Sequence, residues 1–258
     1  MPDLADRNNS EAAIALVLSR VFAKARKRVE DAIGNPPRFS RLDASFWQQL
    51  EQDIRDSLKP KLADIYKASA AQLLDDVETP VTRDAVEVNE GDAAAWALSR
   101  ANEAASSVVR QQRKQIATAQ RNYEEAIVAA GFLLGTAGVL VLAAGGKATR
   151  EQQIRASRAR QEAAEKVSAT FSPTKAASIG VTETTKAASI GELATVARFE
   201  QQTNQEVEKL WVTEADGRVC PICRPLHRRK LSDVPPQYRD GPPAHGNCRC
   251  YLEFKAKP

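Results

Sequence analysis

All four cysteines of this 258-residue chain lie between positions 220 and 250, and none precedes Cys220. They form a Cys-x2-Cys pair and, further along the chain, a His-x2-Cys-x-Cys group. Disulfides usually span the fold that they stabilise, whereas closely spaced pairs near a histidine are typical of a metal site in a reducing compartment. The pattern predicts a metal-binding module built from Cys220, Cys223, His245, Cys248 and Cys250.

Zinc is the metal that this spacing favours. Two cysteines three residues apart can bind one Zn²⁺ from a tight turn, and a second turn of the same kind completes a tetrahedral site. Pro221 stiffens the first turn, and the proline-rich residues 224–244 need metal binding to supply their folding energy. We expect a structural site, filled by protein ligands. It has five ligand candidates for four positions, and His227 is a sixth.

Two alternatives to a metal site exist. The cysteines could form two disulfides, or one of them could be a nucleophile paired with His245. A nucleophile does not need three companion thiols. The sequence has no Walker loop, HExxH or GxSxG motif, and its only two histidines lie in or near the cysteine cluster. We therefore expect the protein not to be an enzyme.

The composition outside the cluster favours helices. Hydrophobic residues make up 43% of the chain and aromatic residues only 5%. We expect a mainly α fold, with an extended multi-helix region over residues 1–209 and loops near 34–44 and 79–91. The module over residues 210–258 is expected to contain short antiparallel strands, at Leu210–Thr213 and Cys250–Phe254.

Capping residues and apolar periodicity predict the first helices. Ser10 is expected to cap a helix that runs to about Val29, and Asp43 to precede a second helix in which Pro60 causes a kink or a new start. Asp92 is expected to cap a long helix to about Glu125. The apolar stripe of the second helix contains Phe46, Leu50, Ile54, Leu58 and Leu62, and that of the long helix Ala94, Leu98, Ala101, Ala105, Val108, Ile116 and Tyr123.

The segment 126–146 is an uninterrupted run without a charged residue. A run of that length could span a hydrocarbon layer as a helix, and Gly131 and Gly135 form a GxxxG motif that allows close helix contact. Its many glycines weaken the apolar signal, so a hairpin buried in protein is the preferred interpretation and membrane contact the alternative.

The next segments are also expected to be helical. Residues 147–166 form a charged helix, and a further helix extends from about Ile190 to Lys209. Between them the sequence TKAASIG occurs at Thr174–Gly180 and again at Thr185–Gly191. The offset between the two copies is close to three helical turns, so both copies are expected on nearly the same face of a helix.

The net charge of +4 is compatible with an anionic partner but does not establish one. Basic residues of the long helix, such as Arg110 and Arg121, are expected to form a solvated face, and contact with nucleic acid or an acidic partner is the alternative. The candidates for contact with nucleic-acid phosphates are Arg224, Arg228, Arg229, Lys230, Arg155 and Arg158.

The C-terminal third resembles a known family. Its signature is carried by Trp211-Val212-Thr213, Asp216, Arg218, Cys220-Pro221-Ile222-Cys223, Pro242-Pro243-Ala244-His245 and Cys248-Arg249-Cys250. The upstream segment Ile179-Gly180-Val181-Thr182-Glu183-Thr184 is similar to the family's Thr-Glu element. Together these residues resemble the phage Mu F-like head-morphogenesis proteins, also called minor head proteins.

The resemblance implies a virion protein of a tailed phage or prophage, made in the bacterial cytoplasm. It implies association with phage portal and capsid proteins, an oligomeric arrangement in the virion and, in some members, contact with viral DNA. It also implies the metal-ligand role for the four cysteines and His245. No role for Thr182 and Glu183 follows, although a glutamate there could orient a ligand.

The sequence departs from the family pattern in two places. A glycine commonly follows the first cysteine pair, whereas this chain has Leu226-His227-Arg228-Arg229. The apolar run 126–146 replaces an ordinary amphipathic helix. Two other functions therefore stay open beside head assembly: a zinc-dependent DNA-binding module, and a membrane-active DNA-ejection protein that uses the apolar run.

Overall fold

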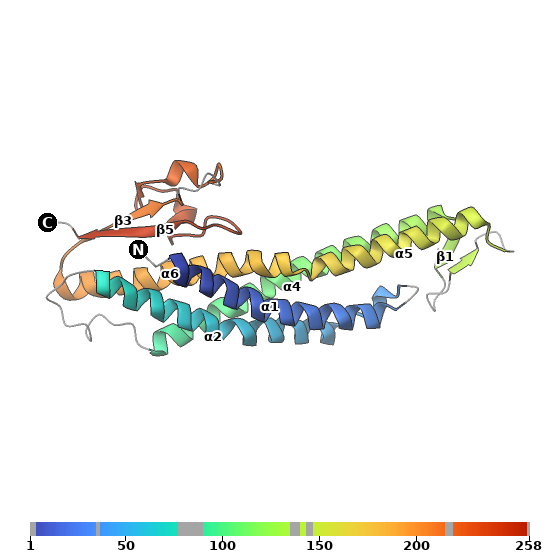
Figure 1. Cartoon of the computed structure of the whole chain (residues 1–258), viewed down its shortest axis with the longest axis horizontal. Helices are drawn as coiled ribbons and strands as arrows, with labels where there is room; N and C mark the ends of the chain where they lie inside the picture. The colour runs from blue at the N-terminus through green and yellow to red at the C-terminus, as the bar shows by residue number, and fades with distance from the viewer. Residues whose placement is uncertain are drawn as a thin grey trace. The chain divides into compact units, whose positions relative to one another are not determined.

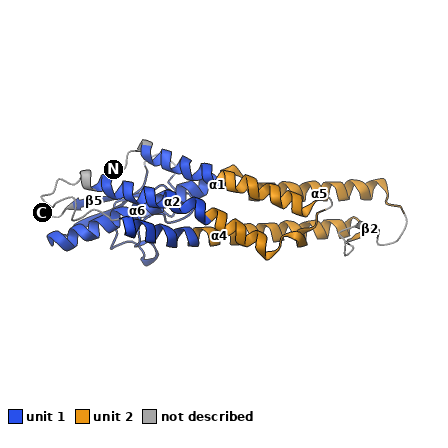
Figure 2. Cartoon of the chain, turned by 90° about the horizontal axis from the view of Figure 1, so that it is seen from below, with its two compact units in different colours: residues 1–18, 55–102, 176–258 blue, residues 19–54, 103–175 orange. Residues whose placement is uncertain are grey.

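The computed structural model describes residues 4–34, 37–76, 90–134, 140–142, 147–214 and 219–256. These residues are mainly helical, with a small antiparallel sheet toward the C-terminus, which confirms the predicted fold class (Figure 1). The chain divides into two compact units, residues 1–18, 55–102 and 176–258 in unit 1 and residues 19–54 and 103–175 in unit 2 (Figure 2). The domain boundary proposed near residue 209 stays a prediction.

Helix α1 spans Leu4–Ile33, so the cap predicted at Ser10 is wrong. The earlier start has a tertiary cause, because the Arg7 side chain in the first turns donates to Thr185, 178 residues away in sequence. The helix ends close to the predicted position. Gly34 adopts a φ of +69°, and its N–H donates to the carbonyl of Glu30 at 3.0 Å, as in a glycine-terminated helix.

Helix α2 spans Ala44–Asp76 and begins at its predicted cap, because Asp43 Oδ1 accepts a hydrogen bond from the Phe46 N–H at 2.9 Å. The helix continues through Pro60, so the new start predicted there is wrong. Leu58 and Leu62 are fully buried on either side of Pro60, and their packing stabilises the turn that lacks one backbone hydrogen bond. The predicted apolar stripe is confirmed as core: Phe46, Leu50, Ile54, Leu58 and Leu62 are all buried.

Helix α4 spans Glu90–Ala129, so Asp92 lies inside the first turn and is not the cap. The carboxylate of Asp92 instead pairs with Arg198. In the first turns the predicted stripe is wrong, because Leu98 is 43% exposed and Ala94 is exposed. Small side chains face the core there, since Ala93 packs with Tyr66 and Ala70. From Ala101 onward the predicted stripe is confirmed: Ala101, Ala105, Val108, Ile116 and Tyr123 are buried. The loop predicted at 79–91 lies outside the described residues, apart from the helical Glu90 and Gly91.

The apolar run 126–146 is not one helix. Its first residues end α4, and the strands β1 (Phe132–Leu134) and β2 (Leu140–Leu142) pair antiparallel, with Leu133 opposite Val141. Gly131 has a φ of +83°, a conformation that glycine adopts readily and that ends the helix there. No helix in the described part of the chain is long and apolar enough to cross a membrane. Residues 135–139 and 143–146 lie outside the described part.

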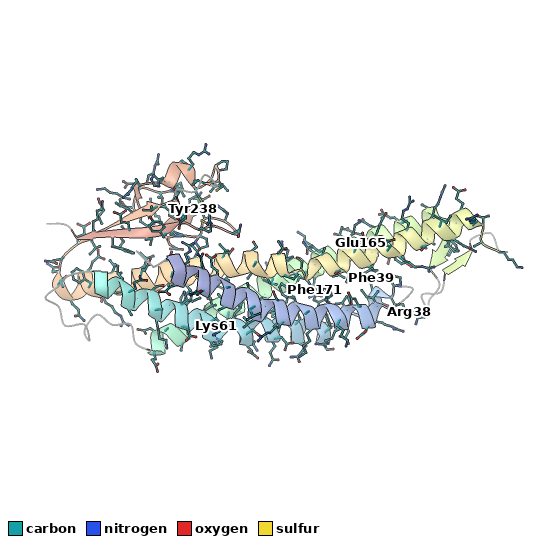
Figure 3. All side chains as sticks on the ribbon, in the orientation of Figure 1. Arg38, Phe39, Lys61, Glu165, Phe171 and Tyr238 are labelled. Atoms are coloured by element: carbon teal, nitrogen blue, oxygen red, sulfur yellow. The ribbon has the colours of Figure 1, made fainter. Side chains whose placement is uncertain are left out.

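The core of unit 2 is built from aromatic and small side chains. Phe171 packs edge-on against Phe22, and Phe39 lies against Tyr123, each pair with ring centroids 6.2 Å apart. Figure 3 labels Phe39 and Phe171 of this unit. Helix α5 spans Arg150–Thr170, close to the predicted 147–166, and Thr149 caps it.

Helix α6 spans Pro173–Thr203 without a break, so the separate helix predicted from Ile190 to Lys209 is wrong in both bounds. Both copies of TKAASIG lie in α6, and Ala176 and Ala187 are fully buried, which confirms that the copies share a face. Their glycines allow close packing. A Cβ at Gly180 would lie 2.8 Å from a backbone oxygen of α1, and one at Gly191 would lie still closer to the backbone oxygen of Tyr66 in α2.

The C-terminal sheet has the strand order β4-β3-β5 and is antiparallel, as predicted. Its strands are β3 (Val207–Val212), β4 (Arg229–Lys230) and β5 (Tyr251–Ala256), and Trp211 lies opposite Leu252. Short 3₁₀ turns η1 (Phe39–Arg41), η2 (Arg224–Leu226) and η3 (Pro236–Tyr238) complete the elements. Trp211 is fully buried at the centre of a cluster that contains Cys223, Leu226, Leu231, Val234, Cys248, Cys250 and Leu252.

Candidate metal centre

The first knuckle, residues 220–223, is a tight turn after β3 in which a backbone N–H group donates to a cysteine sulfur. The Cys223 N–H donates to Cys220 Sγ at 3.3 Å, and the Arg224 N–H donates to the Cys220 carbonyl at 3.0 Å. The Leu226 N–H closes the next turn on the Cys223 carbonyl at 2.9 Å. These bonds turn both cysteine side chains toward the same point, and an N–H directed at Sγ stabilises a thiolate.

The second knuckle, residues 245–250, supplies the imidazole and the other two thiols. His245 Nε2 lies 2.9 Å from Cys220 Sγ and 3.2 Å from Cys223 Sγ. His245 Nδ1 lies 2.7 Å from the carbonyl oxygen of Gly246. A carbonyl can only accept, so Nδ1 carries the proton and the lone pair of the neutral ring is on Nε2, which faces the sulfurs.

These side chains could hold a metal ion. They form two overlapping triads, Cys220–Cys223–His245 and Cys223–Cys248–Cys250. Within each triad the three ligand atoms lie within 4.8 Å of one another. Cys223 Sγ and Cys248 Sγ are 3.7 Å apart. Two sulfurs bound tetrahedrally to one zinc at about 2.3 Å are about 3.8 Å apart, close to this distance. All four cysteines are free, and a cavity of about 110 Å³ opens between them and His245. The donor set and spacing fit a zinc site, whereas the disulfide alternative finds no support.

Burial and hydrogen bonding separate the acidities of the four thiols. Burial raises the pKa of Cys223 to about 12. The hydrogen bond from Cys250 lowers the pKa of Cys248 to about 5, and the pKa of Cys250 is raised by the same bond and by burial. Burial raises the pKa of Cys220, but N–H bonds from the first knuckle outweigh it and the net shift is downward. Desolvation opposes protonation of His245, yet the Gly246 carbonyl and the nearby thiolates raise its pKa.

The region that carries this cluster matches a known family. Residues 146–253 match the model of the family described as Phage Mu protein F like protein. The match assigns these residues to the phage Mu F-like proteins. It confirms the resemblance inferred from Thr174 to Phe254 and points to a phage head-morphogenesis protein. No curated protein and no solved structure matches the chain.

The sixth ligand candidate in the Mu F-like region, His227, is engaged elsewhere. Its Nδ1 accepts a hydrogen bond from the Thr213 N–H at 3.2 Å and lies 2.9 Å from Thr213 Oγ1. The neighbouring Arg228 has a φ of +61°. Glycine is favoured in this left-handed conformation, and a non-glycine residue such as Arg228 adopts it at a cost. The Arg228 N–H donates to the Trp211 carbonyl at 2.7 Å, which joins the turn to β3.

The basic candidates for nucleic-acid contact belong to different units, Arg155 and Arg158 to unit 2 and the other four to unit 1. All six are exposed. Three of them pair with acidic side chains: Arg155 with Glu151, Arg228 with Glu253 and Lys230 with Glu208. These pairs reduce the positive charge that is available to phosphates.

The Thr-Glu element of the Mu F-like region contacts the second knuckle through threonine. Thr182 Oγ1 accepts a hydrogen bond from the Asn247 N–H, whereas Glu183 binds Arg100 of α4. The suggestion that Glu183 orients a ligand is therefore wrong. Sequence reasoning missed Thr185 and Arg7, which also bind the second knuckle. Thr185 is three residues after Thr182 and shares its face, which was a usable signal. The contacts of Arg7 with Thr185 and with the second knuckle have no local signal, because these partners are 178 and 242 residues away in sequence.

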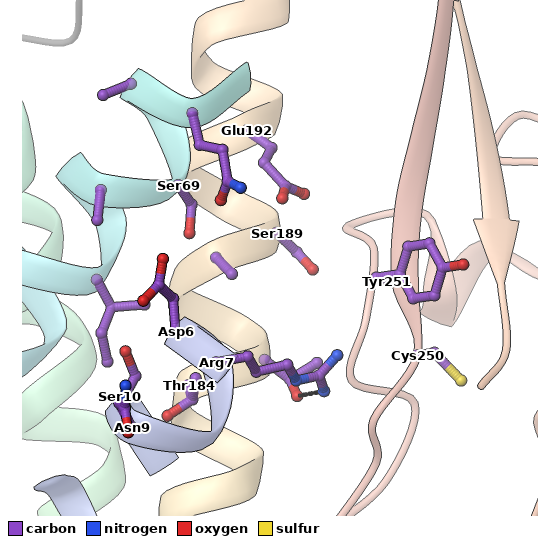
Figure 4. Close-up of a pocket in the computed structure, with 16 residues that line it drawn as sticks. Asp6, Arg7, Asn9, Ser10, Ser69, Thr184, Ser189, Glu192, Cys250 and Tyr251 are labelled. Carbon is purple, nitrogen blue, oxygen red and sulfur yellow. Dashed lines mark hydrogen bonds between the residues drawn. The ribbon is translucent and has the colours of Figure 1, made fainter. Parts of the chain in front are cut away.

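A polar cavity of about 550 Å³ lies beside the second knuckle. Its lining includes Asp6, Ser189, Glu192, Cys250 and Tyr251. Figure 4 shows Arg7 extending from α1 past α6 toward β5, which begins at Tyr251 directly after Cys250. The second knuckle thus contacts α6 through two threonines, with α1 contributing one long side chain.

Proposed function

We propose that the protein is a minor head protein of a tailed phage or prophage, which associates with the portal and procapsid during head assembly and is retained in the virion. The observation that carries the proposal is the Cys/His cluster inside the region that matches the phage Mu F-like family. The role is structural: the cluster offers more donors than a four-coordinate ion needs, which leaves no position for a reacting water.

We propose Zn²⁺ as the bound ion, with Cys220, Cys223, His245 and Cys248 as its ligands. Successive contacts of 2.9, 3.2 and 3.7 Å connect these four donors. Cys250 belongs, like Cys248, only to the second triad, and it is left out of the ligand set because its thiol donates a hydrogen bond to the Cys248 sulfur. Cys250 then acts as a neighbour of Cys248, in the way that partners of a metal ligand commonly tune it.

Elemental analysis of the full chain, purified under reducing conditions, tests the metal site. We expect about one zinc per chain. Cys220→Ser, Cys223→Ser, His245→Ala and Cys248→Ser are each expected to lose most of it, and Cys250→Ser to retain it. Absence of any transition metal from the wild type would refute the metal site. Loss of zinc from the Cys250→Ser variant would refute the proposed ligand set.

Association with the head tests the assembly role. The chain is co-expressed with the portal and major capsid genes of its own phage, and sedimented procapsids are probed by immunoblotting. We expect the wild type to co-sediment with procapsids and Cys223→Ser to do so less. A wild type that stays in the soluble fraction, when portal and capsid protein assemble normally, would contradict the assignment.

Contact with viral DNA is the second candidate, since Arg224, Arg229 and Arg158 are exposed cations. Phosphate contacts make binding weaken steeply with salt. Fluorescence anisotropy with a duplex of arbitrary sequence, at about 50 and about 200 mM salt, measures this dependence, and an Arg224→Ala/Arg229→Ala variant is expected to flatten it. Equal binding by that variant would exclude these two residues.

A further inference from the structure

The second knuckle is bound through its backbone by side chains from two helices. Three consecutive residues, Asn247, Cys248 and Arg249, each have a backbone group in such a contact. The partner side chains come from α6 and α1, which lie 63 to 242 residues away in sequence. Backbone contacts of this kind depend on the position of the loop and not on the identity of its side chains.

Thr185 is the centre of the first contact. Its Oγ1 donates to the carbonyl of Cys248 at 2.8 Å in a buried hydrogen bond, and it accepts from Arg7 Nη2 at 2.7 Å. Arg7 Nη1 donates to the carbonyl of Arg249 at 3.0 Å. The side chain of Arg7 is only 10% exposed. The charged Arg7 guanidinium polarises the Thr185 hydroxyl and so strengthens its hydrogen bond to the buried Cys248 carbonyl. The strengthened bond fixes the plane of the peptide after Cys248.

Thr182 forms the second contact, one helical turn earlier. Its Oγ1 accepts from the Asn247 N–H at 2.7 Å and donates to the Ser178 carbonyl at 2.9 Å. Asn247 has a φ of +62° and lies between His245 and Cys248. A non-glycine residue adopts this conformation at a cost, and it needs surrounding contacts to keep it. The contact with Thr182 therefore stabilises the bend that turns the imidazole and the thiol toward one point.

The neighbouring threonines of α6 make no such contact. Thr184 is 2% exposed, and among the described residues its Oγ1 has no hydrogen-bond partner. Thr195 is also buried, and its Oγ1 donates to the Gly191 carbonyl within the helix at 3.0 Å. Within the described part of α6, the threonines that meet the knuckle are Thr182 and Thr185, which share a face as expected for residues three apart.

We propose that Thr182, Thr185 and Arg7 are positioning residues for the metal site, and that metal binding in the C-terminal module is thereby coupled to the docking of the first turns of α1. This inference rests on the proposed function of the cluster as a metal site. If docked Arg7 and Thr185 favour the metal-binding geometry of the knuckle, then bound metal favours docked α1 by the same factor, because coupling between two sites is reciprocal.

The zinc affinity of the full chain tests whether Thr182, Thr185 and Arg7 position the metal ligands. The dissociation constant is measured by competition with a chromophoric chelator, and the spectrum of the Co²⁺-substituted protein reports the ligand geometry. Loss of a residue that orients a metal ligand typically costs about 10–100-fold in affinity. We expect a loss of that order for Thr185→Val, Thr182→Val and Arg7→Gln, with an altered Co²⁺ spectrum, and recovery in Thr185→Ser and Thr182→Ser.

Thr184→Val and Thr195→Val are the matched controls, since both remove a buried hydroxyl of the same helix that does not touch the knuckle. We expect wild-type affinity from each. Equal affinity in the wild type and the Thr182, Thr185 and Arg7 variants would overturn the inference and leave the metal site intact, whereas a wild type that binds neither Zn²⁺ nor Co²⁺ would overturn both.

Hydrogen exchange tests whether metal binding is coupled to the docking of the first turns of α1. Amide exchange in residues 4–18 is compared in the zinc-loaded wild type and after removal of zinc with a chelator. We expect faster exchange in these turns after zinc removal, and the same fast exchange in Arg7→Gln with or without zinc. Exchange in residues 150–170 serves as an internal reference and is expected to stay constant. Unchanged exchange in residues 4–18 of the wild type would overturn the coupling.

Discussion

Arg100 of α4 and Glu183 of α6 form a bidentate ion pair in which Nε and Nη2 each donate to one carboxylate oxygen at 2.7 Å. The side chain of Glu183 is 6% exposed and that of Arg100 is 24% exposed. The glutamate of the Thr-Glu element therefore joins two helices, while the threonine before it binds the knuckle. Adjacent residues of one motif thus make separate contacts, Glu183 with α4 and Thr182 with the second knuckle.

Removal of this carboxylate is expected to destabilise unit 1 without releasing metal. Glu183→Ala removes two charge-assisted hydrogen bonds from a buried position, which lowers the free energy of unfolding by about 3 kcal/mol. Urea unfolding followed by circular dichroism measures the loss, and elemental analysis measures the zinc content of the folded variant. A variant of wild-type stability, or one that is folded and metal-free, would contradict the separation of roles.

The close approach of α6 to α2 predicts a steric effect at the second glycine of the repeat. In Gly191→Ala the added Cβ would overlap the backbone oxygen of Tyr66, so the helices must move apart. Overpacking of this kind typically costs about 1–3 kcal/mol. Thermal unfolding measures it. Gly246→Ala is the control, because its Cβ would meet nothing within 4 Å; equal melting temperatures for the two variants would refute the packing role.

Zinc uptake is expected to release protons. Burial raises the pKa of Cys223 to about 12, so at neutral pH the metal-free protein carries this thiol protonated, whereas Cys248, with a pKa lowered to about 5, is already a thiolate. Zinc binds the thiolate form, so Cys223 loses its proton on binding and the apparent affinity rises with pH. Isothermal titration in buffers of different ionisation enthalpy counts the protons. Uptake without proton release at neutral pH would show that Cys223 is not a ligand.

The N-terminus of α5 has a capping box, and a substitution there is expected to affect unit 2 alone. Thr149 Oγ1 accepts from the Gln152 N–H at 3.2 Å, and Gln152 Oε1 accepts from the Thr149 N–H at 2.9 Å. Thr149→Ala is expected to destabilise by about 1 kcal/mol, and Thr149→Ser to have little effect. Denaturant unfolding measures both. The zinc dissociation constant is expected to stay at its wild-type value, and a change in it would contradict the assignment of Thr149 and the metal site to separate units.

Local signals predicted the long helices well. Apolar residues at helical spacing identified the buried side of α2, and Asp43 and Gly34 mark boundaries through bonds within a few residues of themselves. Helices α1 and α4 start earlier than the local signals predict, because Arg7 and Asp92 have partners far away in sequence. The exposed Leu98 was misplaced for a related reason, since close packing of α4 at Ala93 selects small side chains over large ones.

The sequence by itself identified the candidate ligands, because thiols and imidazoles at knuckle spacing are rare and act locally through tight turns. It also determined that residues 174–191 repeat on one helix face. Only the tertiary structure decided that His227 binds Thr213, that Glu183 binds Arg100 and that Thr185 and Arg7 reach the second knuckle. Apart from the His227 contact, these bonds join segments that no local pattern connects, since a hydrogen bond across 63 or more residues depends on how whole helices pack.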